Sequence, residues 1–290
     1  MRLTTETDSS AQPQPEQQSP QFLGLHPVRW AGLLILVTVF VTADGYRRVP
    51  TPPAEGASLN GSGAPLTKPT FRVGTFNIQG GVGMDDKLDL NRTADCVKGC
   101  DLIGFQEVHG RTWTDSRDQA QILGEDLAMP WLYAPAETRW WHNSFGNAVI
   151  SDLPVDSWQR FPISGPASTN NRALLIMHFR LGEKILHVID VHIPTTNDRP
   201  AQCAMVTALF FSFEKPAILL GDLNTRPGDP WIEKIRNHAD VVDAVGEFAE
   251  KDEPDHIDWI FARGLQCVGG GAIDRKASDH PFYWADFQTP

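Results

Sequence analysis

The sequence predicts an α+β fold: a four-layer α/β/β/α sandwich of two mostly antiparallel sheets flanked by helices. Three observations predict it. From residue 71 onward, short apolar runs outnumber helical patterns. Consecutive runs are often separated by turn-type residues alone, as around Gly182-Glu183, which is typical of hairpins. No glycine-rich phosphate loop of either common spacing occurs, which argues against a doubly wound parallel sheet.

The individual elements follow from local patterns. Helices are expected where apolar residues recur at helical spacing, with Asp85, Asp86 or Asp89 capping the first and Pro130 lying just beyond the second. These helices are residues 88–97, 116–127 and 200–213. Strands are expected at residues 71–78, 101–105, 147–150, 155–161, 173–181, 184–193, 217–220, 258–262, 265–269 and 282–287.

The first seventy residues differ from the rest. Residues 1–21 are rich in Gln, Ser and Pro and are expected to be disordered. Residues 22–43 contain an uncharged apolar run from Trp30 to Ala43. As a helix this run spans about 21 Å, short of the roughly 30 Å hydrocarbon core. It is either a cleaved signal peptide or a signal anchor that associates with a membrane, and both predict an extracytoplasmic protein, whether secreted, periplasmic or membrane-anchored.

Residues 44–70 are rich in Pro and Gly without periodic apolar positions, which predicts a flexible linker. One domain, expected to be monomeric, then occupies residues 71–290. The formal net charge is −11, so bulk electrostatics do not attract nucleic acid. No CxxC pair occurs, which argues against a structural zinc site. A disulfide and free thiols both remain open for Cys96, Cys100, Cys203 and Cys267.

Polar side chains interrupt the predicted strands at their ends. Each one alone is most simply a turn residue or a helix cap. Together they predict a site at one rim of the sandwich, because strand ends are a rigid place to build one. The residues are Asn77, Glu107, His192, Asp222 with Asn224, Asp258, and Asp279 with His280.

The residue types suit phosphoester chemistry. Mg²⁺ (or Mn²⁺) prefers a few protein oxygens and keeps water ligands, which Glu107 and Asp279 could supply with help from Asn77 and Asp222. Hydrolysis of a phosphodiester also needs an activated water and positive charge near phosphorus. A histidine held by a carboxylate, such as His280 beside Asp258, could serve in proton transfer.

The motifs, in order, resemble those of the endonuclease/exonuclease/phosphatase superfamily. This superfamily includes proteins similar to pancreatic deoxyribonuclease, apurinic endonucleases and neutral sphingomyelinases. The resemblance covers about residues 71–288. The motifs are Thr75-Phe76-Asn77-Ile78, Gly104-Phe105-Gln106-Glu107-Val108, Gly146-Asn147-Ala148-Val149-Ile150-Ser151, Asp190-Val191-His192-Ile193, Gly221-Asp222-Leu223-Asn224, Ile257-Asp258-Trp259-Ile260-Phe261 and Ser278-Asp279-His280.

The resemblance implies a metal-dependent hydrolase in which water attacks phosphorus, with nucleic acid or a phospholipid head group as substrate. In this picture Glu107 is a direct metal ligand, Asn77 helps place the metal and Asp279 is a further ligand. A phosphomonoesterase acting on a small or inositol phosphate remains an alternative. A non-catalytic binding module of the same fold would have lost a metal ligand or a histidine, and neither is missing.

The resemblance also implies roles for five catalytic residues. Asp222 would orient or deprotonate the attacking water, Asn224 would bind a phosphate oxygen, His192 would contact the phosphate, and His280 would act on the phosphoryl oxygens while held by Asp258. Asp190 stands where many relatives have an asparagine. By the two-residue period it shares a face with His192, and it either reaches the site or caps a turn.

Three further residues are candidates for binding substrate. Arg172 could bind an anionic group or form a surface ion pair. Asn147 belongs to one of the motifs. Trp141 lies in the run Arg139-Trp140-Trp141-His142, which could stack on bases, enter a lipid interface or pack in the core.

Overall fold

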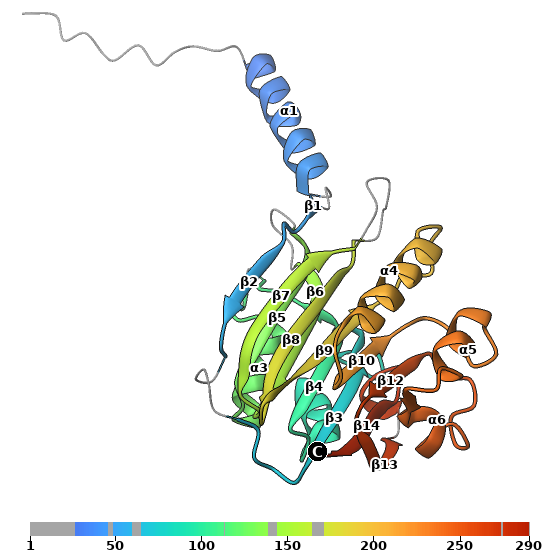
Figure 1. The fold of residues 1–290 in the computed structure, drawn as a ribbon. Coiled ribbons are helices and arrows are strands. Elements are labelled where there is room, and N and C mark those ends of the chain that lie inside the picture. The colour runs from blue at the N-terminus through green and yellow to red at the C-terminus, as the bar shows by residue number, and fades with distance from the viewer. Residues whose placement is uncertain are drawn as a thin grey trace, which may run out of the picture. The chain divides into compact units, whose positions relative to one another are not determined.

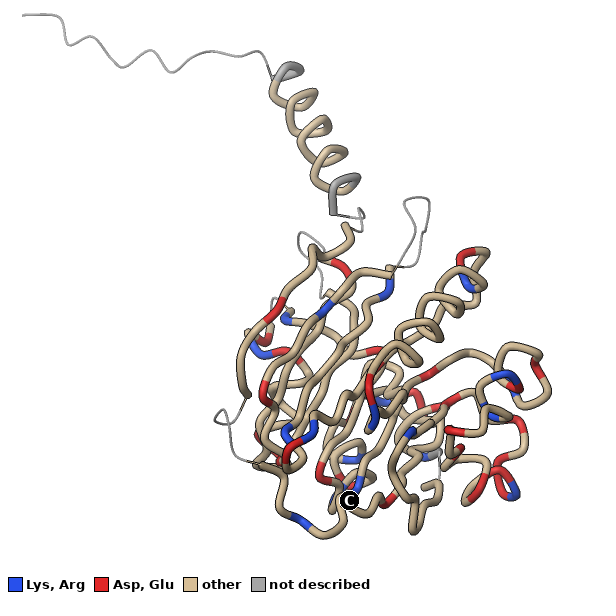
Figure 2. Tube along the Cα trace, in the orientation of Figure 1, with Lys and Arg blue, Asp and Glu red and all other residues tan. Residues whose placement is uncertain are grey.

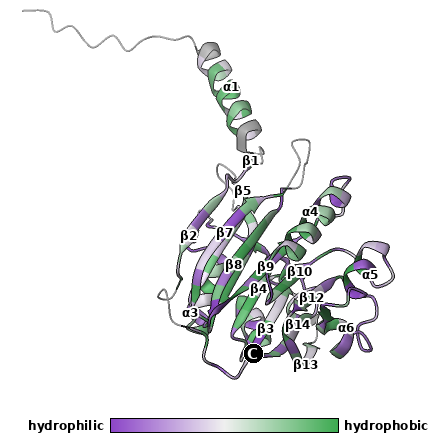
Figure 3. Ribbon diagram, viewed as in Figure 1, coloured by the Kyte–Doolittle hydropathy of each residue, from purple (hydrophilic) through white to green (hydrophobic). Residues whose placement is uncertain are grey.

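The computed structural model describes residues 27–45, 49–59, 65–112, 114–138, 144–163, 171–273 and 275–289. The chain divides into two compact units, Met1–Asp44 and Gly45–Pro290. The described part of the first unit is the helix α1 (Pro27–Gly45), which is hydrophobic along its central turns (Figure 3). No helix in the described ranges combines the length and apolar content needed to cross a membrane.

The second unit contains two sheets (Figure 1), each of seven strands among the described residues. The pairs β3–β4 and β9–β10 are parallel and the other pairs are antiparallel, so both sheets are mostly antiparallel as predicted. The first sheet has the order β1 (Val49–Pro50), β5 (Trp131–Thr138), β6 (Phe145–Ser151), β4 (Leu102–His109), β3 (Thr70–Asn77), β14 (Phe282–Gln288), β13 (Gln266–Ile273). The second has the order β11 (Val241–Asp243), β12 (Asp258–Arg263), β10 (Ala217–Asp222), β9 (Lys184–His192), β8 (Ala173–Leu181), β7 (Val155–Pro162), β2 (Ala54–Ala57).

Three apolar clusters produce the four layers. The largest, which includes Phe71, Val188 and Leu220, lies between the two sheets. A second cluster joins the outer face of the second sheet to α4 (Arg199–Ser212) and α5 (Pro230–Arg236). A third joins the outer face of the first sheet to α2 (Leu90–Val97) and α3 (Gln119–Leu127). The predicted α/β/β/α sandwich is therefore confirmed.

Aspartates begin the short helices, which accounts for part of the negative charge. Asp89 accepts backbone N–H groups at the start of α2, and Asp118 does so at the start of α3. Asp229 and Asp243 cap α5 and α6 (Ala244–Phe248) in the same way. Each carboxylate satisfies donors that a helix N-terminus leaves unpaired. Two 3₁₀ turns, Gln79–Gly81 and Arg275–Ala277, complete the described elements.

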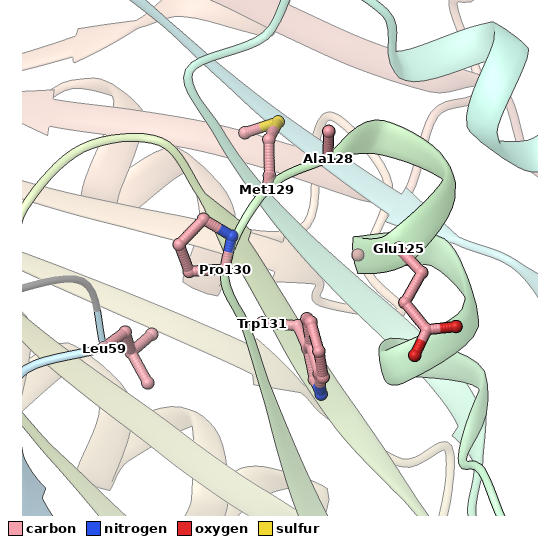
Figure 4. A pocket seen from close by; sticks show the side chains of 7 residues that line it. Leu59, Glu125, Ala128, Met129, Pro130 and Trp131 are labelled. Atoms are coloured by element: carbon pink, nitrogen blue, oxygen red, sulfur yellow. The ribbon is translucent and has the colours of Figure 1, made fainter.

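The segment expected to be a linker contributes strands. Within residues 44–70, β1 pairs with β5 and β2 pairs with β7, so the sandwich begins upstream of Phe71. Leu59 lies beside the connection between α3 and β5, where it borders a cavity of about 530 Å³ with Met129, Pro130 and Trp131 (Figure 4). Short strands at sheet edges gain their order from the partner strand, which a local pattern cannot reveal.

Most predicted strands and helices agree with the structure, and β8 agrees to the residue. The strand β5 was not predicted, because Pro135 interrupts its pattern. The structure accommodates this proline at an irregularity in the β5–β6 pairing between Pro135 and Glu137. The elements α5, β11 and α6 were also missed, since each is too short to show a period.

Candidate active site

The polar strand ends converge at one edge of the two sheets. Asp222, the last residue of β10, is the register partner of His192 at the end of β9 and of Asp258 at the start of β12. Asn77 ends β3 in the facing sheet and pairs with Gln106 of β4. Parallel neighbours end at the same edge and an antiparallel neighbour begins there. The β-topology therefore brings these residues together from distant parts of the sequence.

Asp222 lies at the centre of this cluster and is 1 % exposed. Its Oδ2 accepts a hydrogen bond from Asn77 Nδ2 at 2.9 Å, and its Oδ1 accepts one from the backbone N–H of Asn224 at 2.8 Å. His192 Nε2 lies 3.4 Å from Oδ2. Burial raises the pKa of Asp222 to about 7, and the nearby negative charge of Asp258 adds to the increase.

The glycine before Asp222 permits this arrangement. Gly221 has a φ of +138°, and a Cβ there would overlap the carbonyl oxygen of Val191 on the adjacent strand β9. Only glycine fits both the conformation and the space. Asn224, two residues after Asp222, is also left-handed with a φ of +47°, and its Nδ2 donates to the carbonyl oxygen of Ile193 at 2.8 Å. The turn thus holds Asn224 beside His192.

His280 and Asp258 form a hydrogen-bonded pair, as the sequence predicted. His280 Nδ1 lies 2.7 Å from Asp258 Oδ2, which leaves Nε2 facing Asp222 Oδ2 at 4.0 Å. Burial by itself would lower the pKa of His280. The charge and hydrogen bond of Asp258, with the charges of Asp222 and Asp279, outweigh burial and raise that pKa to about 9. His280 therefore carries a proton at neutral pH.

His192 has the opposite character. It is 2 % exposed, and burial, helped by the positive charges of Arg172 and His280, lowers its pKa well below the usual range. Its ring is neutral, with Nε2 3.3 Å from Asn224 Nδ2. Among the described residues, Nδ1 has no hydrogen-bond partner. The site thus holds one protonated and one neutral imidazole near Oδ2 of Asp222.

Glu107 reaches the cluster through a β-bulge. The β4–β6 register shifts between Phe105 and Val108, and Glu107 adopts a φ of +58° there. Bulges re-aim side chains at functional sites, and the left-handed backbone is a strain that the surrounding sheet holds in place. The side chain is 30 % exposed, with Oε1 4.0 Å from His192 Nε2. No hydrogen bond to the Glu107 carboxylate occurs in the described ranges.

These residues fit a hard divalent cation. Carboxylate oxygens of Asp222 and Asp258 lie within 4.8 Å of each other. His280 lies within the same distance of both, but its imidazole carries a proton and is not a metal ligand in that state. One oxygen of the buried Asp258 carboxylate has no hydrogen-bond partner in the described part of the chain, and the Glu107 carboxylate stands next to this cluster. Closely spaced carboxylates repel one another, and a cation relieves that repulsion. Asn77 supports the group indirectly, because its amide binds Asp222.

Asp279 is less closely tied to the cluster than the sequence suggested. Its side chain is exposed, and its Oδ1 accepts a hydrogen bond from Ser278 Oγ at 3.2 Å. Its charge still contributes to the raised pKa of His280, so it lies within electrostatic range. Ser278 Oγ also donates to the Asn77 carbonyl oxygen at 2.7 Å, which fastens this turn to β3. Asp279 is placed at the rim rather than among the buried carboxylates.

Asp190 and Asn147 lie behind the site. Asp190 is 0 % exposed and belongs to the second sheet. It accepts hydrogen bonds from two residues of the first sheet, Gln106 Nε2 at 2.6 Å and Asn147 Nδ2 at 2.8 Å. Asp190 therefore bridges the sheets and does not cap a turn, while the buried Asn147 amide is used inside the protein instead of facing substrate. Sequence reasoning overlooked Gln106, although it immediately precedes Glu107.

Arg172 lies at the rim of the site. Its guanidinium carbon stands 5.2 Å from the ring centre of Phe145, and that ring lies 6.4 Å from the ring of His192. The effect of Arg172 on the pKa of His192 also places its charge near the cluster. Trp141, the third predicted substrate contact, lies outside the described residues, as do Arg139, Trp140 and His142.

Comparisons with known proteins identify the fold and the family of this chain. No curated protein matches the chain. Solved structures with the same fold include an endonuclease/exonuclease/phosphatase from Beutenbergia cavernae, at 23% identity and a TM-score of 0.61 over 77% of this chain and 72% of that one. They also include a truncated TDP2 from Caenorhabditis elegans, at 18% identity and a TM-score of 0.55 over 76% and 97%. A mannosyl-6-phosphatase from Bacteroides thetaiotaomicron is similar at 16% identity and a TM-score of 0.57 over 75% and 99%.

At these identities the solved structures establish the fold. The family model is more specific, because the Endonuclease/Exonuclease/phosphatase family model matches residues 74–280, which span the strand ends from Asn77 to His280. Membership of that family supports a phosphoester-hydrolysing enzyme, and the cluster around Asp222 has the acids and imidazoles that such chemistry needs. This chain belongs to the endonuclease/exonuclease/phosphatase family.

Proposed function

We propose that this chain is a divalent-metal-dependent phosphodiesterase that uses Mg²⁺ or Mn²⁺. The observation that carries the proposal is the Glu107 carboxylate. It is part-exposed, held by a bulge and free of hydrogen bonds within the described residues. Its Oε1 lies 4.0 Å from His192 Nε2, which itself lies 3.4 Å from Oδ2 of the buried Asp222. A divalent cation bound at Glu107 would supply positive charge to a phosphate oxygen.

Side chains of this protein carry out the proton transfers and bind the phosphate. Asp222 takes the proton of the attacking water, since its oxygens are held by Asn77 and Asn224 and its pKa of about 7 suits a base near neutral pH. His280 offers the proton on Nε2 to the phosphate or to the leaving oxygen, because Asp258 holds Nδ1. His192 and Asn224 contact the phosphate as neutral groups.

Charge favours a diester over a monoester. A phosphomonoester dianion needs more positive charge than a diester monoanion. Within the described residues, Arg172 is the arginine whose positive charge affects the pKa of His192. The cluster itself contains the carboxylates of Asp222 and Asp258, so its balance of charge is not strongly positive. The net charge of −11 and the scattering of Lys and Arg among Asp and Glu (Figure 2) favour a phospholipid head group over a nucleic acid polyanion.

Hydrolysis rates on four substrates test the proposal. We expect full-length protein with Mg²⁺ to hydrolyse the diester bis-p-nitrophenyl phosphate faster than the monoester p-nitrophenyl phosphate. We also expect it to hydrolyse phospholipid in vesicles faster than it nicks plasmid DNA. Faster monoester hydrolysis would make the chain a phosphomonoesterase, and faster nicking would make it a nuclease. No hydrolysis of any of the four with Mg²⁺ or Mn²⁺ would contradict the proposal.

Hydrolysis should depend on a divalent metal ion that is bound by Glu107. EDTA should abolish hydrolysis, and Glu107→Gln should raise the Mg²⁺ concentration for half-maximal rate at least roughly tenfold, because an anionic oxygen ligand is lost. The measurement is the initial rate against Mg²⁺ concentration. Glu125→Gln is the matched control, since Glu125 is exposed and pairs with Arg117. Equal Mg²⁺ dependence of Glu107→Gln and wild type would remove Glu107 from the metal site.

Replacing Asp258 with asparagine should lower the pKa of His280, because the negative charge that raises it is lost. The alkaline limb of the kcat/KM profile should therefore move to lower pH. The stability linked to His280 should change too. In the wild type it is fully present below about 6.5, the usual histidine pKa, and is lost as pH rises toward 9. Asp156→Asn, which removes an aspartate paired with Arg180, should leave the profile unchanged.

Arg172→Ala should raise KM roughly tenfold with a smaller change in kcat, because a charge-assisted contact to the substrate anion is lost. Steady-state kinetics on the diester measure this split. Arg180→Ala removes an exposed arginine of β8 and should behave as wild type. If Arg172→Ala changes neither constant, Arg172 does not contact the substrate.

We also propose that the chain is exported, directed by the apolar run within residues 22–43. The support is the uncharged sequence from Trp30 to Ala43. Cell fractionation and N-terminal sequencing of the mature protein would test this. Recovery of the intact chain from the cytoplasm would contradict it.

A further inference from the structure

Two histidines face each other on the outer face of the second sheet, away from the candidate active site. His178 of β8 and His187 of β9 are direct register partners. Their Nδ1 atoms lie 2.9 Å apart, and the two half-buried rings are nearly perpendicular, at 86°. His187 lies five residues before His192 on the same strand, a separation of roughly 16 Å.

Neighbouring groups hold this pair in position. The ring of His187 stacks on Phe213, which ends α4, with ring centres 4.3 Å apart and an interplanar angle of 4°. His178 meets the same phenylalanine edge-on at 6.0 Å. The backbone N–H of His187 donates to the Pro216 carbonyl oxygen at 3.1 Å. Both imidazoles are therefore oriented before any ligand arrives, which lowers the entropic cost of binding.

The spacing of the two nitrogens suits a shared cation. Two nitrogens each about 2.1 Å from one metal ion stand roughly 3.0 Å apart at a right angle and roughly 3.4 Å apart at a tetrahedral angle. The observed 2.9 Å matches the right angle, which square-planar and octahedral ions adopt. Imidazole nitrogen is a preferred ligand of Ni²⁺, Cu²⁺ and Zn²⁺ and a poor one for Mg²⁺.

The surroundings provide access for an ion. A cavity of about 530 Å³ opens beside His187, and its charged lining residues are two glutamates and two lysines, Glu183, Lys184, Glu214 and Lys215. No third histidine, cysteine or carboxylate joins the pair closely enough to form a three-residue cluster in the described ranges. Water molecules in the cavity would therefore complete the coordination.

We propose that His178 and His187 form a second metal site, selective for Ni²⁺, Cu²⁺ or Zn²⁺ over Mg²⁺. A cation bound there ties β8 to β9 and takes the place of the proton between the two Nδ1 atoms; that proton moves to Nε2 of its own ring, so both imidazoles stay neutral. Because such an ion binds the folded chain alone, it also stabilises the fold.

Calorimetric titration of the full chain with Ni²⁺, in saturating Mg²⁺, tests this site. Wild type should bind one Ni²⁺ that His178→Ala and His187→Ala bind at least tenfold more weakly or not at all. His238→Ala, which removes an exposed histidine elsewhere, and Glu107→Gln, at the candidate active site, should both retain it. Equal Ni²⁺ binding by all five proteins would overturn the proposal, as would the absence of binding to wild type.

Wild-type protein gives an independent answer if a variant fails to fold. Substoichiometric Ni²⁺ should broaden the ring NMR signals of His178 and His187 first, because the ion is paramagnetic and binds between them. Broadening confined to His192 and His280, with no effect on the pair, would mean that the two nitrogens share only a proton. Such a result would leave the proposed phosphodiesterase untouched, since that proposal depends on neither residue.

Discussion

Replacing Asp222 with asparagine should lower kcat by roughly 10³-fold, the usual loss when a residue that moves a proton in the transition state is removed. Asparagine keeps the shape of the side chain but cannot accept a proton near neutral pH. Its amide nitrogen would also face a donor, because Asn77 and the backbone N–H of Asn224 each bind one carboxylate oxygen. Steady-state kinetics on bis-p-nitrophenyl phosphate in saturating Mg²⁺ measure the loss.

The matched control is Asp240→Asn, since Asp240 is exposed and pairs with Lys215 on the surface. This variant should retain wild-type kcat. If Asp222→Asn raises KM and leaves kcat unchanged, Asp222 acts in substrate binding instead of proton transfer. Retention of wild-type kcat by Asp222→Asn would place the reaction somewhere other than this cluster.

Asp190→Ala is expected to lower the free energy of unfolding by about 2–6 kcal/mol, since two buried amide donors lose their acceptors at about 1–3 kcal/mol each. These donors are Gln106 Nε2 and Asn147 Nδ2, which join the sheets through Asp190. The shift in urea midpoint at constant m-value measures the change. Asp190→Asn should lower the free energy of unfolding by less than Asp190→Ala does, because the asparagine amide retains one acceptor oxygen. A loss below about 1 kcal/mol would mean that water replaces the carboxylate.

The contribution of Asp190 to the free energy of unfolding should also depend on pH. Burial raises the pKa of Asp190 to about 7, against the hydrogen bonds from Gln106 and Asn147, which lower it. The folded state thus holds a proton that the unfolded chain releases above about pH 4. Stability from this group is present at low pH and is lost as pH rises through 7. The difference in stability between wild type and Asp190→Asn should therefore be larger at pH 5 than at pH 8.

Local sequence was sufficient for much of the fold. The β8–β9 hairpin was predictable because both strands are long and apolar and Gly182, with its φ of +63°, makes the turn. The helix α2 was predictable because Asp89 caps an amphipathic run. In contrast, β5 and the strands at residues 49–57 carry weak local patterns and gain their order from neighbouring strands.

The sequence by itself determined which residues can do the chemistry, because carboxylates and imidazoles at the ends of apolar strands are visible in the residue order. Family membership rests on the same motifs, from Asn77 to His280. Only the tertiary structure decided how these residues are arranged. It buried Asp222 against Asp258, aimed Glu107 through a bulge and left Asp279 exposed at the rim.

Tertiary structure also buried Asp190 and Asn147 as hydrogen-bond partners between the sheets, and it paired His178 with His187. These outcomes depend on which strands become neighbours and in which register, since hydrogen bonds and burial arise between residues far apart in the chain. The protonation states follow from the same cause, because burial and nearby charge, which appear only on folding, set the pKa values of Asp222 and His280.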